Sequence, residues 1–547
     1  MRLIVFITGI IKRTLLLLFL FSGIYLPGQV PDNSEKYLAD FDYFIEKLIE
    51  THPDPYSGFG NQVEFYRAKQ ILREQIKNVK DDETFVVQLN KFVSKIKDGH
   101  TTIYKLRDKN QDEIKKLPLK LKASSDNIFV LNSTIDYKRL IGKPVIAINH
   151  ITVRDLLEKI KFLDPSENIS GAFYNLIEAL GNEKSAKELF GSCTSLEFTF
   201  RMPLRDSLVR IPFLKDVFFL SEHSKIGILA DNGLLYQAMT GNSKDIGYLA
   251  WNAMSSREMV EQVNRDAPRY TEVNLNAVYG ILQKERTGNI DADILNIPSV
   301  YEQFYLLLKA MKSRNSSYLI IDLRYNAGGM APLIKPLLYI LYGDRYLNFN
   351  SDAEYIVKLS PLYLKKIGFN DIDGYNSSHH SNYKTGDYSF SRFFNDFEAE
   401  MPLSKKREII ESGYYRLGGD YIKKSILIGM PEPQIIVLTS PQTFSAAYHF
   451  VYFLKSLGNT TIIGVASRQA GNTFMETTPI ELPNTKLRGS VSNSKQILFK
   501  SNPESGEILR PDLEMDWQTF KKFNFDANAE VLKAIEMIEN KVHSTPN

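Results

Sequence analysis

The chain has 547 residues, of which 43% are apolar and 24% are charged, the composition of a globular protein and not of a disordered one. Lys and Arg number 67 and Asp and Glu 64; residues 1–28 hold three of the basic residues and no acid, so the remaining chain is neutral, 64 against 64. This balance argues against nucleic acid as a main partner, because phosphate binding needs a concentrated basic face. At roughly 100–200 residues per domain, the length predicts two to four domains.

The N-terminus predicts export. Lys12 and Arg13 precede an apolar run over residues 15–26, after which polar sequence begins. The run is shorter than the about 20 apolar residues of a comfortable membrane span, and it has the charged, apolar and small-residue zones of a secretory signal. We therefore expect a signal peptide over residues 1–28 and a periplasmic or extracellular protein. The apolar stretch 3–11 leaves an uncleaved envelope anchor as the alternative.

Motifs for cofactors and metals are missing from the sequence. It contains no G-x-G-x-x-G after a predicted strand, no Walker loop and no H-E-x-x-H. The one cysteine, Cys193, allows neither an intrachain disulfide nor a cysteine-based zinc site. His379 and His380 are adjacent in a polar stretch, which is typical of solvated side chains. We expect neither a cofactor nor a metal.

Apolar residues recur at helical spacing through the first part of the mature chain. The helices that this periodicity predicts cover residues 35–50, 63–77 and 83–96. A β-prone segment follows at residues 101–104. We therefore expect a helical domain over residues 30–110.

The middle of the chain is richer in strands. The predicted elements are short strands over residues 116–123, 127–132 and 143–150 and an amphipathic helix over residues 153–160. We treat residues 115–165 as one small module. Residues 165–270 are mixed in character, and the sequence does not divide them.

The last part of the chain predicts an α/β architecture. Its predicted elements are, in order, a helix over residues 301–312, a strand over 317–323, a strand over 434–439, a helix over 446–457 and a strand over 461–465. Continuous apolar strands of this kind are typical of parallel sheets. Strand, helix and strand in succession imply right-handed crossovers and a sheet covered by helices. The polar stretch 345–430 predicts an insertion or a lid.

Two turns and one histidine could carry chemistry. Gly328 and Gly329 follow a predicted buried strand, where outward-facing amides would suit an oxyanion hole, although an ordinary strand-to-helix turn explains them as well. Ser445 falls where a predicted helix begins, either as a nucleophile in the positive field of the helix or merely as an N-cap. His100 follows a predicted helix, either as a base for a distant hydroxyl or as a surface histidine.

Together these segments resemble the carboxyl-terminal processing and tricorn-type serine peptidase family. The matching pieces are HPDPY (52–56), KDGHTTI (97–103), LIIDLRYNAGG (319–329), VLTSPQTFSAA (437–447), TTIIGVAS (460–467), ELPNTKL (481–487) and ILRPDLEMD (508–516). The resemblance implies a crotonase-like catalytic core of repeated β-β-α units, here within residues 200–545. It also implies an N-terminal helical domain and a PDZ-like middle module at 115–165.

The resemblance further implies an exported serine endopeptidase with Ser445 as the acylating nucleophile. Backbone amides of Gly328 or Gly329 and of Ala446 would form the oxyanion hole. Many family members take their base from a Lys in a later turn, where this chain has Ala470. A serine–lysine dyad is therefore not expected.

The tricorn-like branch of the family takes its base from a His in the segment before the core, and His100 occupies that position. The group that would orient His100 stays open among Asp98, Glu504 and Glu507, and we prefer Glu507. The family's Ser before this His is replaced by Gly99.

The alternative function is a catalytically inactive peptide-binding protein that keeps the peptidase fold. The missing Lys and the missing Ser favour it, whereas the joint retention of His100, the paired glycines and Ser445 speaks against it. A third reading, acyl-CoA chemistry on the same core fold, fits poorly with export into a compartment without CoA. The expected partner is thus a peptide or protein substrate, with membrane contact only through an uncleaved signal segment. The sequence leaves the oligomeric state open.

Overall fold

The computed structural model describes residues 34–104, 114–221, 224–226, 234–240, 245–351, 353–392, 397, 401–413 and 419–544. The signal peptide expected over residues 1–28 lies outside them. None of the helices in these ranges combines the length and the apolar character that a bilayer crossing requires.

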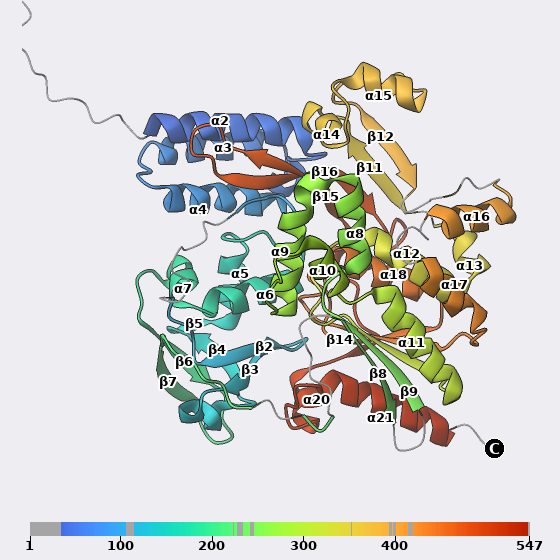
Figure 1. Ribbon diagram of the computed structural model, residues 1–547. Helices are drawn as coiled ribbons and strands as arrows, with labels where there is room; N and C mark the ends of the chain where they lie inside the picture. The colour runs from blue at the N-terminus through green and yellow to red at the C-terminus, as the bar shows by residue number, and fades with distance from the viewer. Residues whose placement is uncertain are drawn as a thin grey trace, which may run out of the picture.

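A six-stranded sheet organises the C-terminal half of the chain (Figure 1). Its strands, in spatial order, are β17 (Leu513–Glu514), β14 (Thr460–Gly464), β13 (Gln434–Thr439), β10 (Tyr318–Asp322), β9 (Asp245–Trp251) and β8 (Leu234–Thr240). All neighbours pair in parallel except β8, which runs antiparallel to β9. The predicted parallel strands over residues 317–323, 434–439 and 461–465 are therefore confirmed, each within one residue of its predicted bounds.

Helices cover both faces of this sheet. They are α11 (Val300–Ser313), α12 (Ile334–Tyr342) and α18 (Ala446–Leu457) on one face and α20 (Trp517–Lys522) and α21 (Ala529–Ser544) on the other (Figure 1). Leu319 and Ile321 of β10 belong to the first apolar cluster, whereas Ile320 belongs to the second. Because side chains alternate along a strand, an unbroken apolar run needs a helical layer on each side.

The N-terminal helices pack against a long hairpin and not against the central sheet. They are α2 (Ser34–Thr51), α3 (Gln62–Ile76) and α4 (Asp82–Val93), and the hairpin strands are β15 (Asn472–Glu481) and β16 (Arg488–Ile497). Phe41 and Phe44 share a buried cluster with Val491 of the hairpin. The following strand β1 (Thr102–Ile103) pairs antiparallel with β16. The segment before β1, which holds His100, is thereby fixed to the C-terminal part of the chain.

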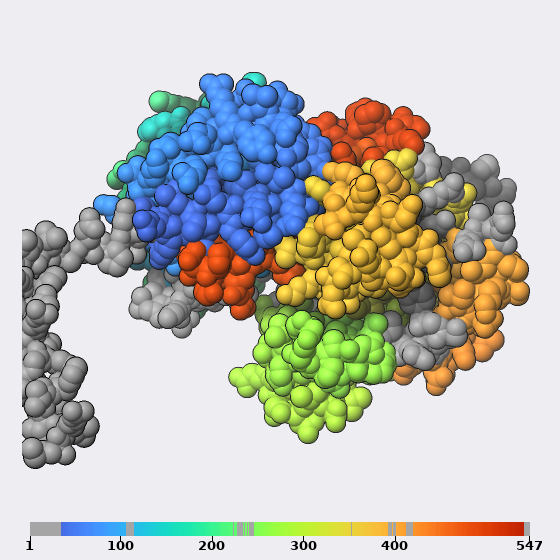
Figure 2. Space-filling view, turned by 90° about the horizontal axis from the view of Figure 1, so that it is seen from above, coloured from blue at the N-terminus to red at the C-terminus, as the bar shows by residue number. Residues whose placement is uncertain are grey.

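The same sheet continues into the polar stretch 345–430. Its elements are α13 (Asp344–Leu347), β11 (Glu354–Lys358), α14 (Pro361–Lys366), α15 (Ile372–His379), β12 (Tyr388–Arg392), α16 (Leu403–Gly413) and α17 (Gly419–Leu427). β11 pairs with both β16 and β12. The Tyr388 hydroxyl donates to the Pro53 carbonyl over 2.7 Å, and Figure 2 shows this segment (gold) beside the N-terminal helices (blue).

A third sheet, also antiparallel, lies in the middle of the chain. Its strands are β2 (Leu119–Ala123), β3 (Ile128–Ser133), β4 (Pro144–Ile148), β5 (Ile151–Thr152), β6 (Ser195–Phe200) and β7 (Ser207–Pro212). The helices α5 (Val153–Ile160), α6 (Ile169–Leu180) and α7 (Glu183–Phe190) pack on it and share its apolar cluster. The strands predicted over residues 116–150 and the helix over 153–160 are confirmed.

The remaining helices are short. They are α8 (Arg257–Asp266), α9 (Thr271–Leu282) and α10 (Ile290–Leu295), which form a small apolar cluster of their own, and α19 (Pro503–Glu507) near the start of β15. Short 3₁₀ turns lie at Ser57–Phe59, Ser94–Ile96, Ile135–Leu140, Pro268–Tyr270 and Ala331–Leu333.

Candidate active site

Ser445 occupies a strained turn between β13 and α18. Its backbone has φ 53° and ψ −126°, a conformation that a residue with a Cβ adopts only under constraint. Its amide donates to the side-chain oxygen of Gln469, which is fully buried, and the amide of Phe444 donates to the Asn326 carbonyl over 3.0 Å. The Ser445 hydroxyl makes no N-cap hydrogen bond, so helix capping does not explain why a serine stands here.

The predicted glycine pair lies directly against this turn. A Cβ on Gly328, whose φ is +96°, would lie 2.7 Å from the Cβ of Ser445, so only glycine fits. The Gly328 amide donates to Asn326 Oδ1 over 2.8 Å. The amides of Gly329 and Ala446 donate to no group within the described part of the chain. Two of the three predicted oxyanion donors are thus free, and Gly328 is engaged within its own loop.

His100 reaches the same place from the other side. Its ring stacks on the ring of Phe444, the residue before Ser445, with centroids 4.6 Å apart and planes 22° apart. The side chain is 11% exposed. Neither ring nitrogen has a hydrogen-bond partner among the described residues, so the structure holds no hydrogen bond between His100 and the Ser445 hydroxyl. His100 is connected to Ser445 only indirectly in the described structure, through its stacking on the ring of the preceding residue, Phe444.

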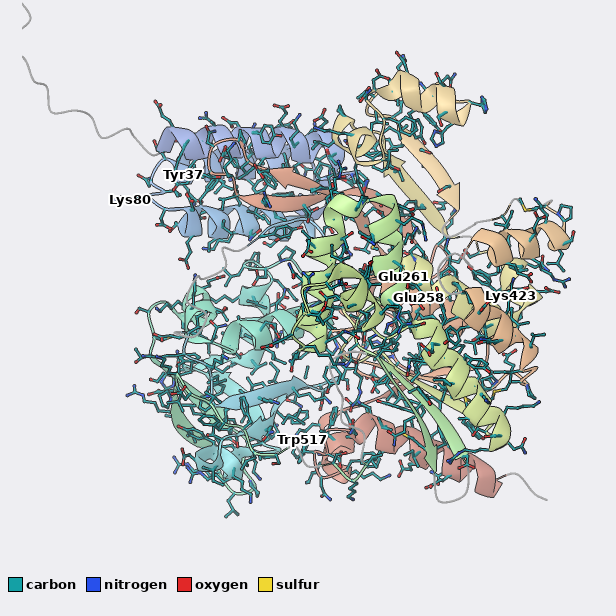
Figure 3. The ribbon with its side chains drawn as sticks, in the orientation of Figure 1. Tyr37, Lys80, Glu258, Glu261, Lys423 and Trp517 are labelled. Atoms are coloured by element: carbon teal, nitrogen blue, oxygen red, sulfur yellow. The ribbon has the colours of Figure 1, made fainter. Side chains whose placement is uncertain are left out.

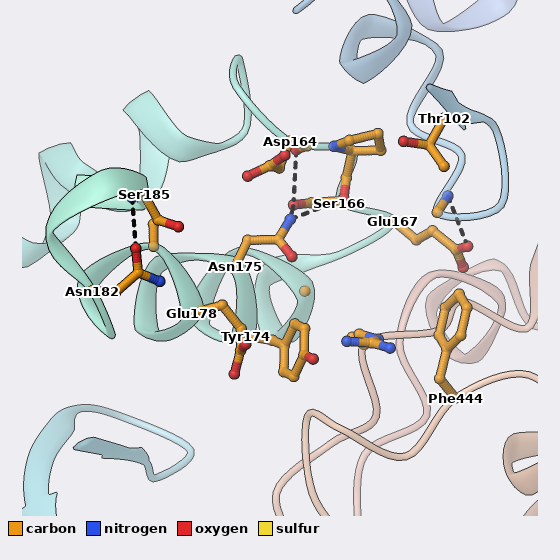
Figure 4. Close-up of a pocket in the computed structure, with 15 residues that line it drawn as sticks. Thr102, Asp164, Ser166, Glu167, Tyr174, Asn175, Glu178, Asn182, Ser185 and Phe444 are labelled. Carbon is orange, nitrogen blue, oxygen red and sulfur yellow. Dashed lines mark hydrogen bonds between the residues drawn. The ribbon is translucent and has the colours of Figure 1, made fainter. Parts of the chain in front are cut away.

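Two carboxylates lie next to the His100 ring. Glu167 Oε1 is 3.6 Å and Asp98 Oδ1 is 3.9 Å from His100 Nδ1. Glu167 accepts hydrogen bonds from the amide of Gly99 over 3.1 Å and from that of Ala470 over 2.9 Å, and Figure 4 shows its side chain beside Phe444. Ala470 therefore supplies a backbone donor to the Glu167 carboxylate.

The structure does not bring Glu507 to His100. Glu507 is exposed at the end of α19, and its backbone carbonyl accepts a hydrogen bond from Asn168 over 3.4 Å. Glu504 is exposed in the same short helix. Sequence reasoning missed Glu167 because it lies in the undivided stretch 165–270, in no motif and on no periodic face.

The carboxylates set the protonation of His100. Burial lowers the pKa of the His100 ring, but the nearby Glu167 carboxylate, and then Asp98, raise it by more, so that the pKa lies above the ordinary 6.5. Arg468 acts in the opposite direction without reversing the balance. A histidine in this environment is able to accept a proton and hold it.

Asp98 forms buried contacts with both the HPDPY motif (52–56) and the KDGHTTI motif (97–103). Its side chain is fully buried, accepts from the His100 amide over 2.8 Å and contacts His52 Nε2 at 3.2 Å. His52 Nδ1 accepts from the Asp54 amide over 3.1 Å, so Nε2 carries the proton and donates to Asp98. Burial raises the pKa of Asp98, but the hydrogen bond from His52, with that from Thr101, outweighs it and lowers the pKa to about 2. Asp98 is thus a carboxylate at neutral pH.

Asp98, His100 and Glu167 offer ligand atoms within 4.8 Å of one another, a spacing that a metal ion could use. However, both oxygens of each carboxylate already contact hydrogen-bond donors of the protein. The donors satisfy these oxygens without an ion. The arrangement is therefore that of two hydrogen-bonded carboxylates beside a histidine ring.

A polar cavity of about 440 Å³ lies beside Phe444. It opens between the start of α6 and the segments that hold His100 and Arg468, and Tyr174 and Phe444 both line it (Figure 4). The guanidinium carbon of Arg468 lies 3.9 Å from the ring centroid of Tyr174 and 4.6 Å from that of Phe444. A side chain of a bound peptide has room here.

Part of the glycine-loop motif is structural. Arg324 is buried, pairs with Asp322 and Glu530 at 2.7 Å each, and donates to Asn528 Oδ1 over 3.0 Å. Tyr248 adds a hydroxyl hydrogen bond to Asp322 over 2.7 Å. This network ties the end of β10 to α21 and so holds the loop that carries Gly328.

The comparison with protein families decides the class. Residues 291–497, which include the glycine loop and Ser445, match the model of peptidase family S41. Over these residues the chain resembles the serine peptidases of family S41, and its enzyme class is that of a serine-type peptidase. It is a hydrolase whose substrates are peptides or proteins. Among curated proteins, none matches its sequence.

Solved structures resemble this peptidase over most of its length. Mature CPAF complexed with lactacystin has a TM-score of 0.53 at 14% identity and covers 92% of this chain and 99% of its own. Mature CPAF alone gives 0.53 at 13% identity, with 92% and 98% covered. The photosystem II D1 C-terminal processing protease gives 0.37 at 10% identity, with 90% and 95% covered. Because only 14% and 13% of the residues are identical, the likeness to CPAF shows a similar fold and nothing more.

Proposed function

We propose that this peptidase is exported and cleaves peptide bonds through an acyl-enzyme on Ser445. The observation that carries the proposal is the strained Ser445 turn. A serine with φ 53° and no capping role, packed on Gly328 beside the free amides of Gly329 and Ala446, has the features of a nucleophile turn. Such strain persists where a neighbouring structure enforces it, and it commonly marks a functional site.

In the proposed reaction His100 is the general base. It takes the proton of the Ser445 hydroxyl as the oxygen attacks the carbonyl carbon, and then gives that proton to the leaving amine. The amides of Gly329 and Ala446 hold the oxyanion of the tetrahedral intermediate. Water then attacks the acyl carbon while His100 takes its proton; the ester bond to the Ser445 oxygen breaks, His100 returns the proton to that oxygen, and the acid product leaves. The hydrogen bond between His100 and Ser445 forms when substrate binds, because catalytic hydrogen bonds are often long in the free enzyme.

Glu167 replaces Glu507 as the proposed group that orients His100. Its carboxylate lies 3.6 Å from Nδ1 and is held by two backbone amides. A fixed carboxylate on Nδ1 favours the tautomer with a free Nε2 and stabilises the imidazolium that forms. Asp98 supports the same ring from its own loop through the His100 amide.

Export, the crotonase-like core over residues 200–545 and the PDZ-like module over 115–165 also remain proposals. So do the helical domain over 30–110 and the lid over 345–430.

Support for export comes from the signal-like N-terminus over 1–28. Mass spectrometry of the protein from a periplasmic or culture fraction tests it, and an intact N-terminus in the membrane fraction would favour the anchor instead.

A catalytically inactive peptide-binding protein stays as the second candidate, because His100 and the Ser445 hydroxyl share no hydrogen bond in the described structure. Such a protein would keep the cavity beside Phe444 without turnover.

Labelling with a fluorophosphonate probe separates the two. The mature protein, Ser445→Ala and His100→Ala would be labelled in parallel and the adduct located by peptide mapping. Adduct on Ser445 that is lost in both variants supports the proposed nucleophile and base. Adduct that survives His100→Ala overturns the choice of base. No adduct on a folded wild-type protein favours the binding protein.

A further inference from the structure

A second, larger hollow lies away from the reacting groups. It has a volume of about 920 Å³ and lies between α3, the end of α4 and the segment that follows α5. Ser166, next to Glu167, lines both this hollow and the cavity beside Phe444. We call the hollow the N-terminal groove. Ser166 is the one described residue that borders both hollows, so the groove and the cavity beside Phe444 are neighbours.

The floor of the N-terminal groove is apolar and open. Ile71 of α3 is 53% exposed and Phe162, just after α5, is 62% exposed. Both line the groove, with Phe59 and Phe92 nearby. Two large apolar side chains exposed in one concavity lose burial free energy of roughly 1.5–3 kcal/mol each, unless a partner covers them.

The rim of the groove is basic. Lys91, Lys95 and Lys97 line it, and none of them has a carboxylate oxygen within 4 Å in the described part of the chain. The other charged lining groups form close pairs, Arg67 with Glu64 at 3.7 Å and Lys161 with Glu158 at 2.8 Å. The groove therefore presents three uncompensated positive charges, although the mature chain as a whole is neutral.

The three lysines lie close together along the chain. Lys91 is in the last turn of α4, and Lys95 is in the 3₁₀ turn Ser94–Ile96 that follows it. Lys97 has φ +60°, a left-handed conformation. Neighbouring positive charges with no anion between them predict an anionic ligand that the groove itself does not supply.

We propose that the N-terminal groove is an exosite for an acidic segment of the polypeptide substrate that also carries apolar side chains. This proposal rests on the proposed function in one respect: the bound segment is called a substrate because the protein is proposed to cleave peptides. The exposed Ile71 and Phe162 would contact the apolar side chains, and the three lysines would face the carboxylates. Because Ser166 borders both hollows, a segment bound in the groove would leave its next residues near the cavity beside Phe444. A concave groove suits an extended chain better than the flat surface of an anionic bilayer.

Binding tests the exosite without relying on turnover. The mature Ser445→Ala protein would be titrated into a fluorescein-labelled peptide of three Glu-Leu-Glu-Ser repeats, followed by anisotropy. Two matched peptides carry Lys in place of Glu or Ser in place of Leu. We expect the acidic, apolar peptide to bind at least about 10-fold tighter than either, with an affinity that falls as salt rises.

Charge reversal locates the site. Lys91→Glu with Lys95→Glu, and separately Phe162→Ser, should each weaken binding of the acidic peptide by about 10-fold or more. The matched control is Lys69→Glu with Lys80→Glu, two lysines of the same helical region that do not line the groove. Lys80 projects from the loop before α4 (Figure 3). The control should bind as the parent does, and thermal unfolding checks that all variants are folded.

Three results would overturn the exosite: equal affinity for the acidic and basic peptides, equal weakening by the control pair, or binding to phosphatidylglycerol vesicles in place of peptide. The last would assign the groove to a membrane. If the fluorophosphonate experiment fails while peptide binding follows the groove variants, only the proposed catalysis is lost.

Discussion

Ser445 combines a strained backbone with a hydroxyl that caps nothing. Gln469 holds its amide, Asn326 holds the residue before it, and Gly328 packs on its Cβ. These contacts enforce a conformation that a free serine would leave. The free energy stored at this single residue makes stability and activity separable there.

Ser445→Gly should unfold at a higher temperature and lose its activity. Glycine adopts φ 53° and ψ −126° without a Cβ clash, so we expect a gain of about 1 kcal/mol after the extra freedom of the unfolded glycine is subtracted. kcat/KM should fall by at least about 10³-fold. Thermal unfolding and a peptidase assay measure the two effects. An unchanged or lower stability would mean that the serine backbone is not strained.

Glu167→Gln should lower kcat by about 10–100-fold and shift the pH profile. The base must be neutral, so activity falls as pH drops through the His100 pKa, which lies above 6.5. Removal of the Glu167 charge leaves burial to lower this pKa, so the acid limb should move to lower pH. kcat/KM from about pH 5 to about pH 9 measures the shift.

Glu507→Gln is the matched control for Glu167→Gln, since its carboxylate is exposed and away from the ring. If Glu507→Gln moves the acid limb and Glu167→Gln does not, Glu507 orients the base after all.

The raised pKa of His100 also affects the stability of the fold. Protonation of His100 favours the folded state below pH 6.5, and this contribution is lost as pH rises through the folded-state pKa.

At the scale of elements, the ends of β10 and β13 build the site, and buried polar groups hold them in register. The Thr443 hydroxyl donates to the Leu323 carbonyl over 2.8 Å, which joins the two loops directly. Arg324 fastens the β10 end to α21 through Asp322 and Glu530. The loop geometry that leaves the Gly329 and Ala446 amides free thus depends on a buried network of charged side chains.

Arg324→Met should destabilise the protein by about 3–5 kcal/mol, because it leaves the buried Asp322 without its cation. Glu530 would keep Lys122 at 2.6 Å. Denaturant unfolding measures the loss. Arg324→Lys, which keeps a charge but not the planar fork, should lose less. Equal stability of Arg324→Met and wild type would show that the network contributes nothing to folding.

Across the whole molecule, segments far apart in sequence meet at the site. Glu167 links the His100 loop, the start of α6 and the turn at Ala470. At the far end of the hairpin, the buried Asp40 of α2 accepts four hydrogen bonds from Asn484 and Thr485. The N-terminal helices are therefore attached to the C-terminal hairpin at both of its ends.

Asp40→Ala should loosen this attachment. It removes the acceptor of four hydrogen bonds from a fully buried position, and we expect a loss of about 3 kcal/mol in unfolding free energy. Hydrogen exchange should rise across residues 34–104 and 472–497 together, and kcat should fall because His100 is carried by that segment. Asp40→Asn keeps an acceptor oxygen and should lose less. Faster exchange confined to α2 would argue against a shared unit.

The local spacing of apolar residues was sufficient to predict many of the helices and strands. The strand over 434–439 and the helices over 153–160 and 446–457 have the predicted bounds, because apolar spacing within each segment decides its burial. The hairpin of β15 and β16 was not predicted, since its pairing with β1 and β11 depends on residues more than a hundred positions away.

The sequence by itself determined the strands β10, β13 and β14 and the helices α11 and α18 of the central sheet, the family resemblance, and the placing of Ser445, Gly328 and Gly329 at strand ends. Local spacing and turn chemistry are enough for such features. Only the tertiary structure decided that Glu167, and not Glu507, lies beside His100, and that the Gly328 amide is already engaged. Side-chain partners of this kind are set by segments that meet in space after folding, and no local pattern records them.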